Sequence, residues 1–488
     1  MYTRTIARLP TNMPTLLDLP NELLEGILSC IAPNDLDNFV LSCKLLHKLA
    51  TLRLQEHKVL KRDLTRVDNR RPFKANQISE LLHHILVMPF KADYVQQVYI
   101  DDWHWRFFDP NEDDEAAESC PHHLYADNTM QAFKTAVQKT DSIPIGDKER
   151  WISRIECGDE NPVLGLLLSK LHYLTSINIS LTSMEDRFLF QILEGAIKEP
   201  GSPSFSRLLE VEISGISLEM HNLCLLTIFA ALPSVTSLKA RRLFGEDWHH
   251  HKAFSLTPHS SNLRDLDLEG CNISCSAFFN LIKSAKSLRS FTYSYPEYSD
   301  RCYRSETPPA FTWACAALFE YTSTSLEELT LCGYQFIPNP KTSECSFRSY
   351  QILRVLTIDY ALLMGNKILA TNNIVTVLPA SLEILNLFGC HIDNASFKEL
   401  VKWTIKVKER EVPRLKELNF KQTLGLWHFT VEEMEKVCAT AVEAGFELNV
   451  GPKYGLLDVR PTTISNGASA ESSWGSPIPY YYERYIAG

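Results

Sequence analysis

Apolar positions near the start of the chain recur at helical spacing and predict three short helices between residues 16 and 52. Pro20 suits a first helical position, where its missing N–H costs nothing. Pro33 then ends the first helix, and Asn34 is the expected N-cap of the second. The apolar stripes of the three helices are Leu23, Leu24, Ile27 and Leu28; Leu36, Phe39 and Val40; and Cys43, Leu46, Leu49 and Leu52.

From residue 174 onward a second pattern recurs, in which apolar residues occupy positions one, four and six of a short segment. A helix-like segment follows many copies, as at residues 275–286 and 395–407. Five copies fit the leucine-rich-repeat template L-x-x-L-x-L-x-x-N/C-x-L, and the four that start at Leu174, Val235, Leu288 and Leu415 are looser. One copy would also suit an amphipathic helix, but several near-regular copies predict a βα solenoid with a curved parallel sheet. The copies start at Leu174, Leu208, Val235, Leu263, Leu288, Leu326, Leu353, Leu382 and Leu415.

Residues between the repeated leucines are expected to line the concave face of this sheet, because side chains alternate along a strand. Solenoids commonly bind partners on that face, although a merely solvated face is the alternative. Most of the charged positions are acidic, which favours a ligand with basic residues. The candidate target-binding residues are Glu210, Glu212, Lys239, Arg241, Asp265, Asp267, Glu269, Glu328, Asp359, Asn386, Phe388, Glu417 and Asn419.

Composition indicates a soluble, intracellular protein. Of 488 residues, 45% are apolar and 22% are charged, as in ordinary globular chains. The net charge of −10, with no basic stripe, is evidence against nucleic-acid binding. Thirteen scattered cysteines without a C-x-x-C pair favour a reducing compartment. No secretory signal and no run of 18 apolar residues is found, so we expect a cytoplasmic or nuclear location and no membrane contact.

Catalytic chemistry has little support in the sequence. No G-x-S-x-G, Walker, G-x-G-x-x-G or H-E-x-x-H motif is present, and we expect no cofactor. Histidines at 249–251 and the Cys120-Pro121-His122-His123 segment lack a complementary ligand set, so polar loops are expected there rather than a metal site. A catalytic cysteine with a distant histidine stays open, because such partners meet only in the folded protein.

The three N-terminal helices offer more apolar surface than so small a bundle can bury. The rest of the chain could cover the excess, or a partner could. The order Leu19-Pro20-x-Glu22-Leu23-Leu24-x-x-Ile27-Leu28-Ser29, then Asp35-Leu36, then Ser42-Cys43-Lys44, resembles the F-box. The resemblance covers about the whole length of that motif. Many members carry Trp two residues after the final Lys, where this chain has Leu46.

The F-box resemblance implies docking on a Skp-type adaptor, which links such proteins to a cullin and thus to a ubiquitin ligase. The chain would then be a non-enzymatic substrate receptor whose repeats bind a target protein. A repeat scaffold in a non-ligase F-box complex is the alternative, and an enzyme with its site in residues 51–171 ranks third. The adaptor-binding residues implied are Leu19, Pro20, Leu23, Leu24, Ile27, Leu28, Leu36 and Leu46.

The expected organisation is α/β, with a small helical F-box followed by the solenoid. Helices are expected at 77–87, 130–139 and 145–155, and a strand at 94–100. The expected regions are a flexible N-terminus (1–14), the F-box (15–60), a helical linker with irregular first repeats and an acidic loop at 109–118 (61–171), the solenoid (172–450) and a mostly disordered tail (451–488).

Overall fold

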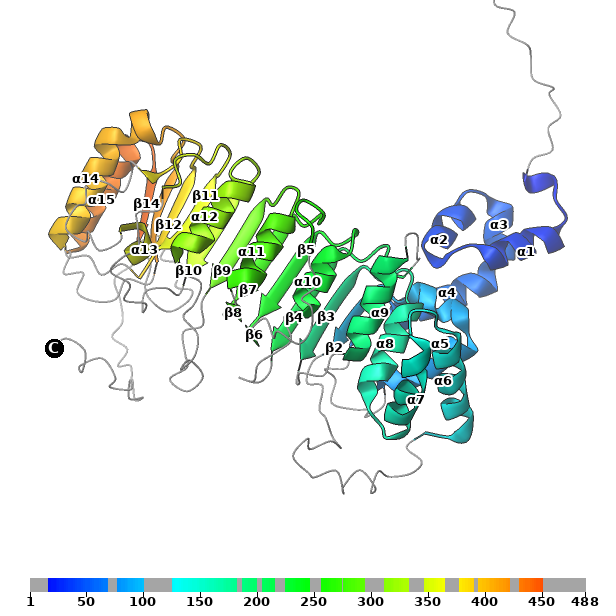
Figure 1. Ribbon diagram of the computed structural model, residues 1–488. Helices are drawn as coiled ribbons and strands as arrows, with labels where there is room; N and C mark the ends of the chain where they lie inside the picture. Colours follow the sequence, from blue (N-terminus) through cyan, green and yellow to red (C-terminus); the bar gives the residue numbers. More distant parts are fainter. Residues whose placement is uncertain are drawn as a thin grey trace, which may run out of the picture.

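A computed structural model describes residues 16–68, 77–100, 125–181, 187–199, 204–215, 224–245, 256–273, 275–294, 311–332, 346–364, 377–389, 394–421 and 430–450. Within these ranges the fold is α/β, with a 12-stranded sheet in which every pair of neighbours is parallel. The strands follow one another in chain order, as expected when each repeat stacks on the one before it (Figure 1).

The predicted repeat starts are confirmed. Each of the nine begins two residues before a strand, and each starting residue is at most 1% exposed. The strands of the long sheet are β1 (Arg66–Asp68), β2 (Gln97–Ile100), β3 (Ser176–Leu181), β4 (Glu210–Gly215), β5 (Ser237–Arg241), β7 (Asp265–Glu269), β9 (Ser290–Ser294), β10 (Glu328–Cys332), β11 (Val355–Asp359), β12 (Ile384–Phe388), β13 (Glu417–Lys421) and β14 (Glu447–Val450). A second sheet pairs β6 (Phe244–Gly245) with β8 (Asn272–Ile273).

Three strands extend the sheet beyond the predicted repeats. β2 falls within the strand expected at 94–100, and its leading residue Val95 is fully buried. β1 is likewise preceded at the same distance by Leu64, which packs on the core. β14 was missed because Gly445, with a φ of +82°, stands where other repeats carry a leucine or valine. An apolar template cannot detect a repeat that starts with a turn glycine.

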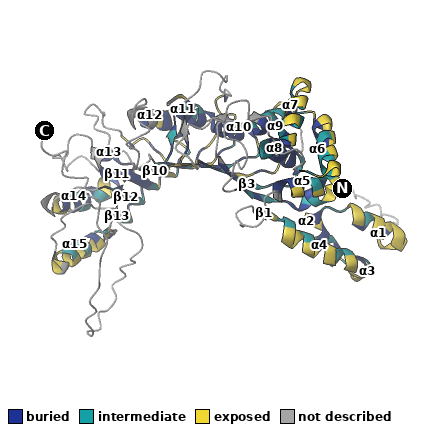
Figure 2. Ribbon diagram, turned by 90° about the horizontal axis from the view of Figure 1, so that it is seen from below, coloured by how far each residue is buried: buried dark blue, intermediate teal, exposed yellow. Residues whose placement is uncertain are grey.

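Helices cover one face of the sheet, and Figure 2 shows the strands on an arc with α10–α12 on its outer side. The helix predicted at 77–87 is confirmed, while that at 145–155 divides into a 3₁₀ turn and α7. The elements are α5 (Gln77–Val87), η2 (Pro89–Tyr94), α6 (Asp127–Lys139), η4 (Ile145–Asp147), α7 (Lys148–Glu156), α8 (Glu160–Lys170), α9 (Arg187–Lys198), α10 (Cys224–Ala231), α11 (Cys275–Ser284), α12 (Phe311–Thr322), α13 (Tyr360–Met364), α14 (Asn394–Glu411) and α15 (Val431–Glu443).

Backbone hydrogen bonds fix the register between repeats. The carbonyl of Arg264, just before β7, accepts from the N–H groups of Arg289 and Ser290 at 2.7 and 3.0 Å. The carbonyl of Arg289 in turn accepts from Glu327 and Glu328 at 2.8 and 2.9 Å. One continuous apolar core then runs from Ile78 to Leu448 between the sheet and the helices. A repeat cannot bury its apolar side alone, so this core exists only in the stack.

The turn after β7 explains the cysteine of the repeat template. Gly270 adopts a φ of +61°, which costs a glycine little, and brings the buried Cys271 under the sheet edge. The Cys271 thiol donates to the carbonyl of Ala240 at 3.3 Å, and burial raises its pKa to about 12. A thiol held protonated in this way has a structural role at the turn.

The N-terminal helices form a separate unit at the β1 end of the sheet (Figure 1). It comprises η1 (Leu16–Asp18), α1 (Asn21–Cys30), α2 (Pro33–Leu41), α3 (Lys44–Leu49) and α4 (Thr51–Leu64). The expected N-cap is wrong, because Ala32 caps α2 and Asn34 lies in its first turn. The expected domain boundary at residue 60 falls inside α4, which runs directly into β1.

Candidate functional site

The implied adaptor-binding residues divide into two groups. Leu23 is 55% exposed, Pro20 is exposed, and Leu19 and Ile27 are half-buried. The other four are at most 2% exposed and support the fold of the unit itself, so direct contact with a partner is excluded for them in this conformation: Leu24, Leu28, Leu36 and Leu46. The sequence pattern could not separate the groups, because both recur at the same helical spacing.

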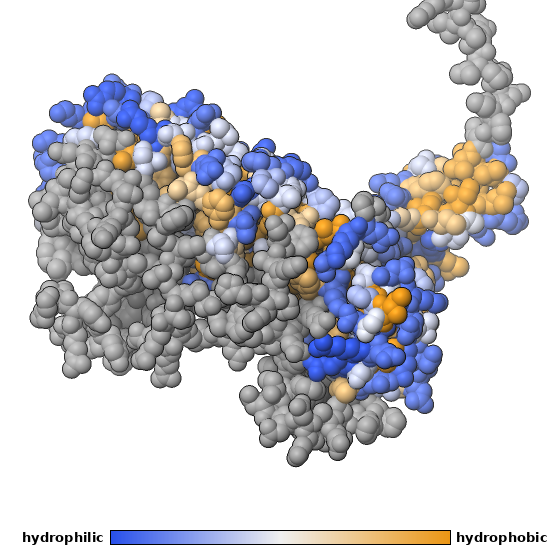
Figure 3. All heavy atoms as spheres, in the orientation of Figure 1, coloured by the Kyte–Doolittle hydropathy of each residue, from blue (hydrophilic) through white to orange (hydrophobic). Residues whose placement is uncertain are grey.

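Further apolar side chains of this unit are exposed. Leu41 is 76% exposed and Leu45 is 37% exposed, at the end of α2 and the start of α3. Figure 3 shows apolar side chains gathered over α1–α3. Among the described residues, half of the exposed large hydrophobic side chains lie within this short unit: Leu16, Leu17, Leu23, Leu41, Leu45, Leu52 and Val59. We call them, with Leu19, Pro20 and Ile27, the apolar face.

The first helices of the unit have a small core of their own, while Leu64 at the end of α4 packs on the solenoid core. Leu28, Leu36, Val40 and Ala50 form a cluster distinct from the one that fills the solenoid. Figure 1 shows the unit projecting from the end of the sheet, and the solenoid therefore leaves the apolar face uncovered. Exposed apolar surface of this extent is typical of interaction sites, so the apolar face is a candidate docking surface.

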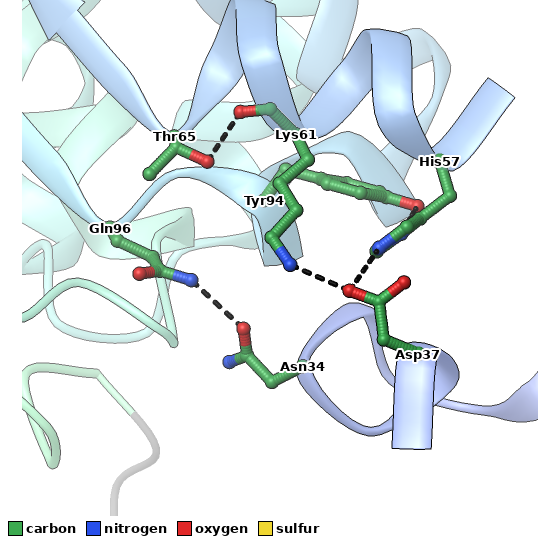
Figure 4. A network of polar contacts seen from close by, with 7 residues as sticks. All are labelled: Asn34, Asp37, His57, Lys61, Thr65, Tyr94 and Gln96. Carbon is green, nitrogen blue, oxygen red and sulfur yellow. Dashed lines mark hydrogen bonds and ion pairs between the residues drawn. The ribbon is translucent and has the colours of Figure 1, made fainter. Parts of the chain in front are cut away.

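Polar contacts at Asp37 and His57 hold α2 against α4, and His57 also reaches Tyr94 of η2 at the junction with the solenoid (Figure 4). Lys61 on α4 donates to Asp37 on α2 at 2.7 Å, and this bond lowers the pKa of Asp37. His57 is 1% exposed; its Nδ1 lies 3.1 Å from the Tyr94 hydroxyl, and its Nε2 lies 3.4 Å from Asp37 Oδ2. The latter separation is long for a hydrogen bond, so that contact is mainly electrostatic.

A second link fixes the same junction. The Gln96 amide, just before β2, donates to the Asn34 side chain at 2.9 Å (Figure 4). Together with the unbroken α4, these contacts orient the helical unit relative to the first strands. Asn34, which was predicted to be an N-cap, instead accepts a hydrogen bond at this junction.

The predicted concave face is confirmed in its alternation. In β4, β5 and β7 every second residue is buried, and the intervening charged residues face away from the core. Arg241 on β5 pairs with Glu212 on β4 at 2.7 Å and with Glu269 on β7 at 2.9 Å. Two of the predicted acidic positions are therefore already neutralised by one guanidinium.

Two residues predicted to face solvent on the concave face are buried instead. Asp359 is 3% exposed and Asn386 is 6% exposed. Asn386 belongs to a row of side chains that bond from strand to strand across β11–β14. Asn386 donates to Thr357 at 2.8 Å, Asn419 donates to Asn386 at 2.9 Å, and Asn449 donates to Asn419 at 2.8 Å. Thr357 and Asn386 are buried, and buried polar groups need such partners, so these bonds stabilise the sheet.

A row of alternating charge lies at the residue just before each of five consecutive strands: Arg289, Glu327, Arg354, Glu383 and Lys416. Glu383 accepts from Arg354 at 3.0 Å and from Lys416 at 2.7 Å. These bonds lower the pKa of Glu383 to about 2. The sequence analysis missed this row. Its signal is that the residue directly after the leading leucine of these five repeats alternates in charge from one repeat to the next.

A depression of about 420 Å³ lies on the concave face across β5, β7, β9 and β10. Its floor at β9 carries only the small hydroxyl side chains of Ser290 and Thr292. Its walls carry four carboxylates, Asp265, Asp267, Glu327 and Glu328, and two cations, Lys239 and Arg289.

Asp267 is the least satisfied of these carboxylates. Its Oδ1 is buried without a hydrogen-bond partner among the described atoms. Burial, together with nearby Glu269, raises the pKa of Asp267, while Arg241 and Lys239 oppose the shift. Of the predicted contact residues, four line this depression: Lys239, Asp265, Asp267 and Glu328.

The described part of the chain shows no group of three or more His, Cys, Asp or Glu side chains placed to hold a metal ion. None of its helices combines the length and the apolar character needed to cross a bilayer. The histidines at 249–251, the segment 120–123, the acidic stretch 109–118 and both predicted terminal regions, 1–14 and 451–488, lie outside the described residues.

No family model matches this chain, and no curated protein matches it. The features of the described residues that bear on function are the apolar face, the concave face and the junction between them.

Proposed function

We propose that this chain is the substrate-recognition subunit of a Skp–cullin–F-box type ubiquitin ligase. In this proposal the apolar face docks on a Skp-type adaptor, and the concave face of the solenoid holds a target protein. Ubiquitin transfer would be catalysed by the conjugating partner, not by this chain. The resemblance of residues 19–44 to the F-box motif supplies the partner.

One observation carries the proposal: a helical unit with a core of its own exposes leucines that the solenoid leaves uncovered. A unit this small gains stability when a partner covers such surface. The separate concave face leaves the chain able to hold a second protein at the same time.

Co-purification tests this function. The full chain is co-expressed with a Skp-type adaptor and a cullin, and the complex is isolated through a tag on the cullin. We expect a stable three-part complex. A complex with the adaptor that excludes the cullin would support the non-ligase scaffold instead, and failure to bind the adaptor would refute both.

A further inference from the structure

The depression over β9 differs from the rest of the concave face in its balance of charge. Arg241 pairs with Glu212 and Glu269 outside the depression. Within it, Arg289 lies 3.8 Å from Glu327, while no ion pair is found for Asp265, Asp267 or Glu328 among the described residues. Its walls therefore hold more negative charge than the chain's own cations neutralise.

The shape of the depression follows from the side chains at β9. Asp265, Ser290 and Glu328 are direct neighbours across β7, β9 and β10. A short hydroxyl thus lies between two carboxylates in the same row. Adjacent strands lie about 4.8 Å apart, so the two carboxylates stand roughly 10 Å from each other. We call the part of the depression between them, over Ser290 and Thr292, the trough. A lysine or arginine side chain entering between them would meet an acceptor on each side.

Beyond β10, the residues at the same level of the sheet as Asp265, Ser290 and Glu328 are apolar. Glu328 is followed across the sheet by Val355 on β11 and Ile384 on β12, both half-buried. These apolar side chains lie two and three strands from Ser290, or about 10–14 Å. An extended chain advances about 3.3 Å per residue, so this distance corresponds to three or four residues.

We propose that this row recognises an extended segment of the target in which a lysine or arginine and an apolar residue stand three or four positions apart. The cation enters the trough over Ser290 and Thr292, between Asp265 and Glu328, and the apolar side chain covers Val355 and Ile384. The inference rests on the proposed function, in which the concave face holds a target. It adds the chemical class of the segment that is held.

The buried oxygen of Asp267 favours a cationic hydrogen-bond donor in the trough. A carboxylate with a buried oxygen and no hydrogen-bond partner is costly, and a donor entering the trough would reduce that cost. The raised pKa of this carboxyl reports the same cost. Charge-assisted hydrogen bonds of this kind are stronger than neutral ones.

Synthetic peptides test the inference directly. The full chain is immobilised, and Gly/Ser decapeptides carrying one arginine and one leucine four positions apart are measured by surface plasmon resonance. We expect binding that weakens at least tenfold when citrulline, a neutral isostere, replaces arginine, and that weakens when arginine and leucine are adjacent. Equal binding of the citrulline peptide, or no binding of any peptide, would overturn the inference.

Matched variants locate the site. Asp265→Asn with Glu328→Gln should weaken the arginine peptide about tenfold, whereas Glu432→Gln, an exposed carboxylate on α15, should leave it unchanged. Thr292→Arg places a cation in the trough from the chain itself, so it should keep or raise the melting temperature and abolish peptide binding. Unchanged peptide binding by a folded Thr292→Arg variant would overturn the inference.

Adaptor binding is measured on the same preparations. Loss of peptide binding with the adaptor still bound refutes only the inference about the target segment. Peptide binding without adaptor binding refutes only the ligase assignment. The two failures are therefore distinguishable.

Discussion

The apolar face gives the sharpest prediction. The triple variant Leu23→Ser, Leu41→Ser, Leu45→Ser removes side chains that are 55%, 76% and 37% exposed. Together they present about as much surface as one and two-thirds leucines, and full burial of a leucine contributes about 1.5–3 kcal/mol. Covering them in a complex should therefore contribute about 3 kcal/mol, or roughly a hundredfold in affinity.

Isothermal titration calorimetry against a purified Skp-type adaptor measures this loss. The control is Ile145→Ser with Val442→Ser, which removes apolar side chains 88% and 61% exposed on distant elements. The control should bind the adaptor as the wild type does. Both variants should unfold at nearly the wild-type temperature, because substitutions at exposed positions cost little stability.

Three results would refute the reasoning. The triple variant could bind with unchanged affinity, which would place the interface elsewhere. The control could lose affinity equally, which would mean that the affinity for the adaptor does not depend on the apolar face in particular. The triple variant could unfold, which would show that these leucines serve the unit's own core.

Leu329→Ala, at a fully buried position of β10, should lower the free energy of unfolding in urea by about 3–4 kcal/mol. Glu328→Gln beside it should change that free energy by less than about 0.5 kcal/mol. Similar values for both would contradict the assignment of Leu329 to the core and Glu328 to the concave face. Asn419→Ala breaks bonds to both Asn386 and Asn449 and should cost about 1–3 kcal/mol. Asn178→Ala, at the equivalent position of β3 but outside the hydrogen-bonded row of β11–β14, should cost less, and equal losses would show that the row adds no stability. Glu383 has its pKa lowered from 4.5 to about 2, so its pairing stabilises the fold above pH 4.5 and is lost as the pH falls toward 2. The melting temperature of Glu383→Gln should thus lie below that of the wild type at pH 6 and converge with it near pH 2; a gap that persists at pH 2 would exclude the carboxylate's charge as its cause.

Much of the solenoid could be predicted because its signal is local and repeated. The position of each leading apolar residue, from Leu174 to Leu415, located a strand two residues later. Alternation within strands also placed Glu212 and Asp265 on the face away from the core. A repeat that starts with Gly445 escaped the same reasoning, since a glycine carries no apolar signal.

The candidate sites were predicted less well, because exposure depends on what packs over a residue from elsewhere. Leu23 and Leu24 are adjacent and equally apolar, yet one is 55% exposed and the other is fully buried. Asp359 follows the pattern of a solvent-facing residue, but it is 3% exposed. The cross-strand pairing of Asn386 with Thr357 likewise depends on strands 29 residues apart.

Periodicity by itself determined that this chain is a stack of βα repeats preceded by short amphipathic helices. Both features come from side chains within a few residues of one another, so the order of amino acids contains them directly. Only the tertiary structure decided that the helices project from the β1 end with an uncovered apolar face, and that β9 forms a hydroxyl-floored trough between carboxylates. Those features arise where segments distant in sequence meet, and no local pattern specifies which residues will face each other there.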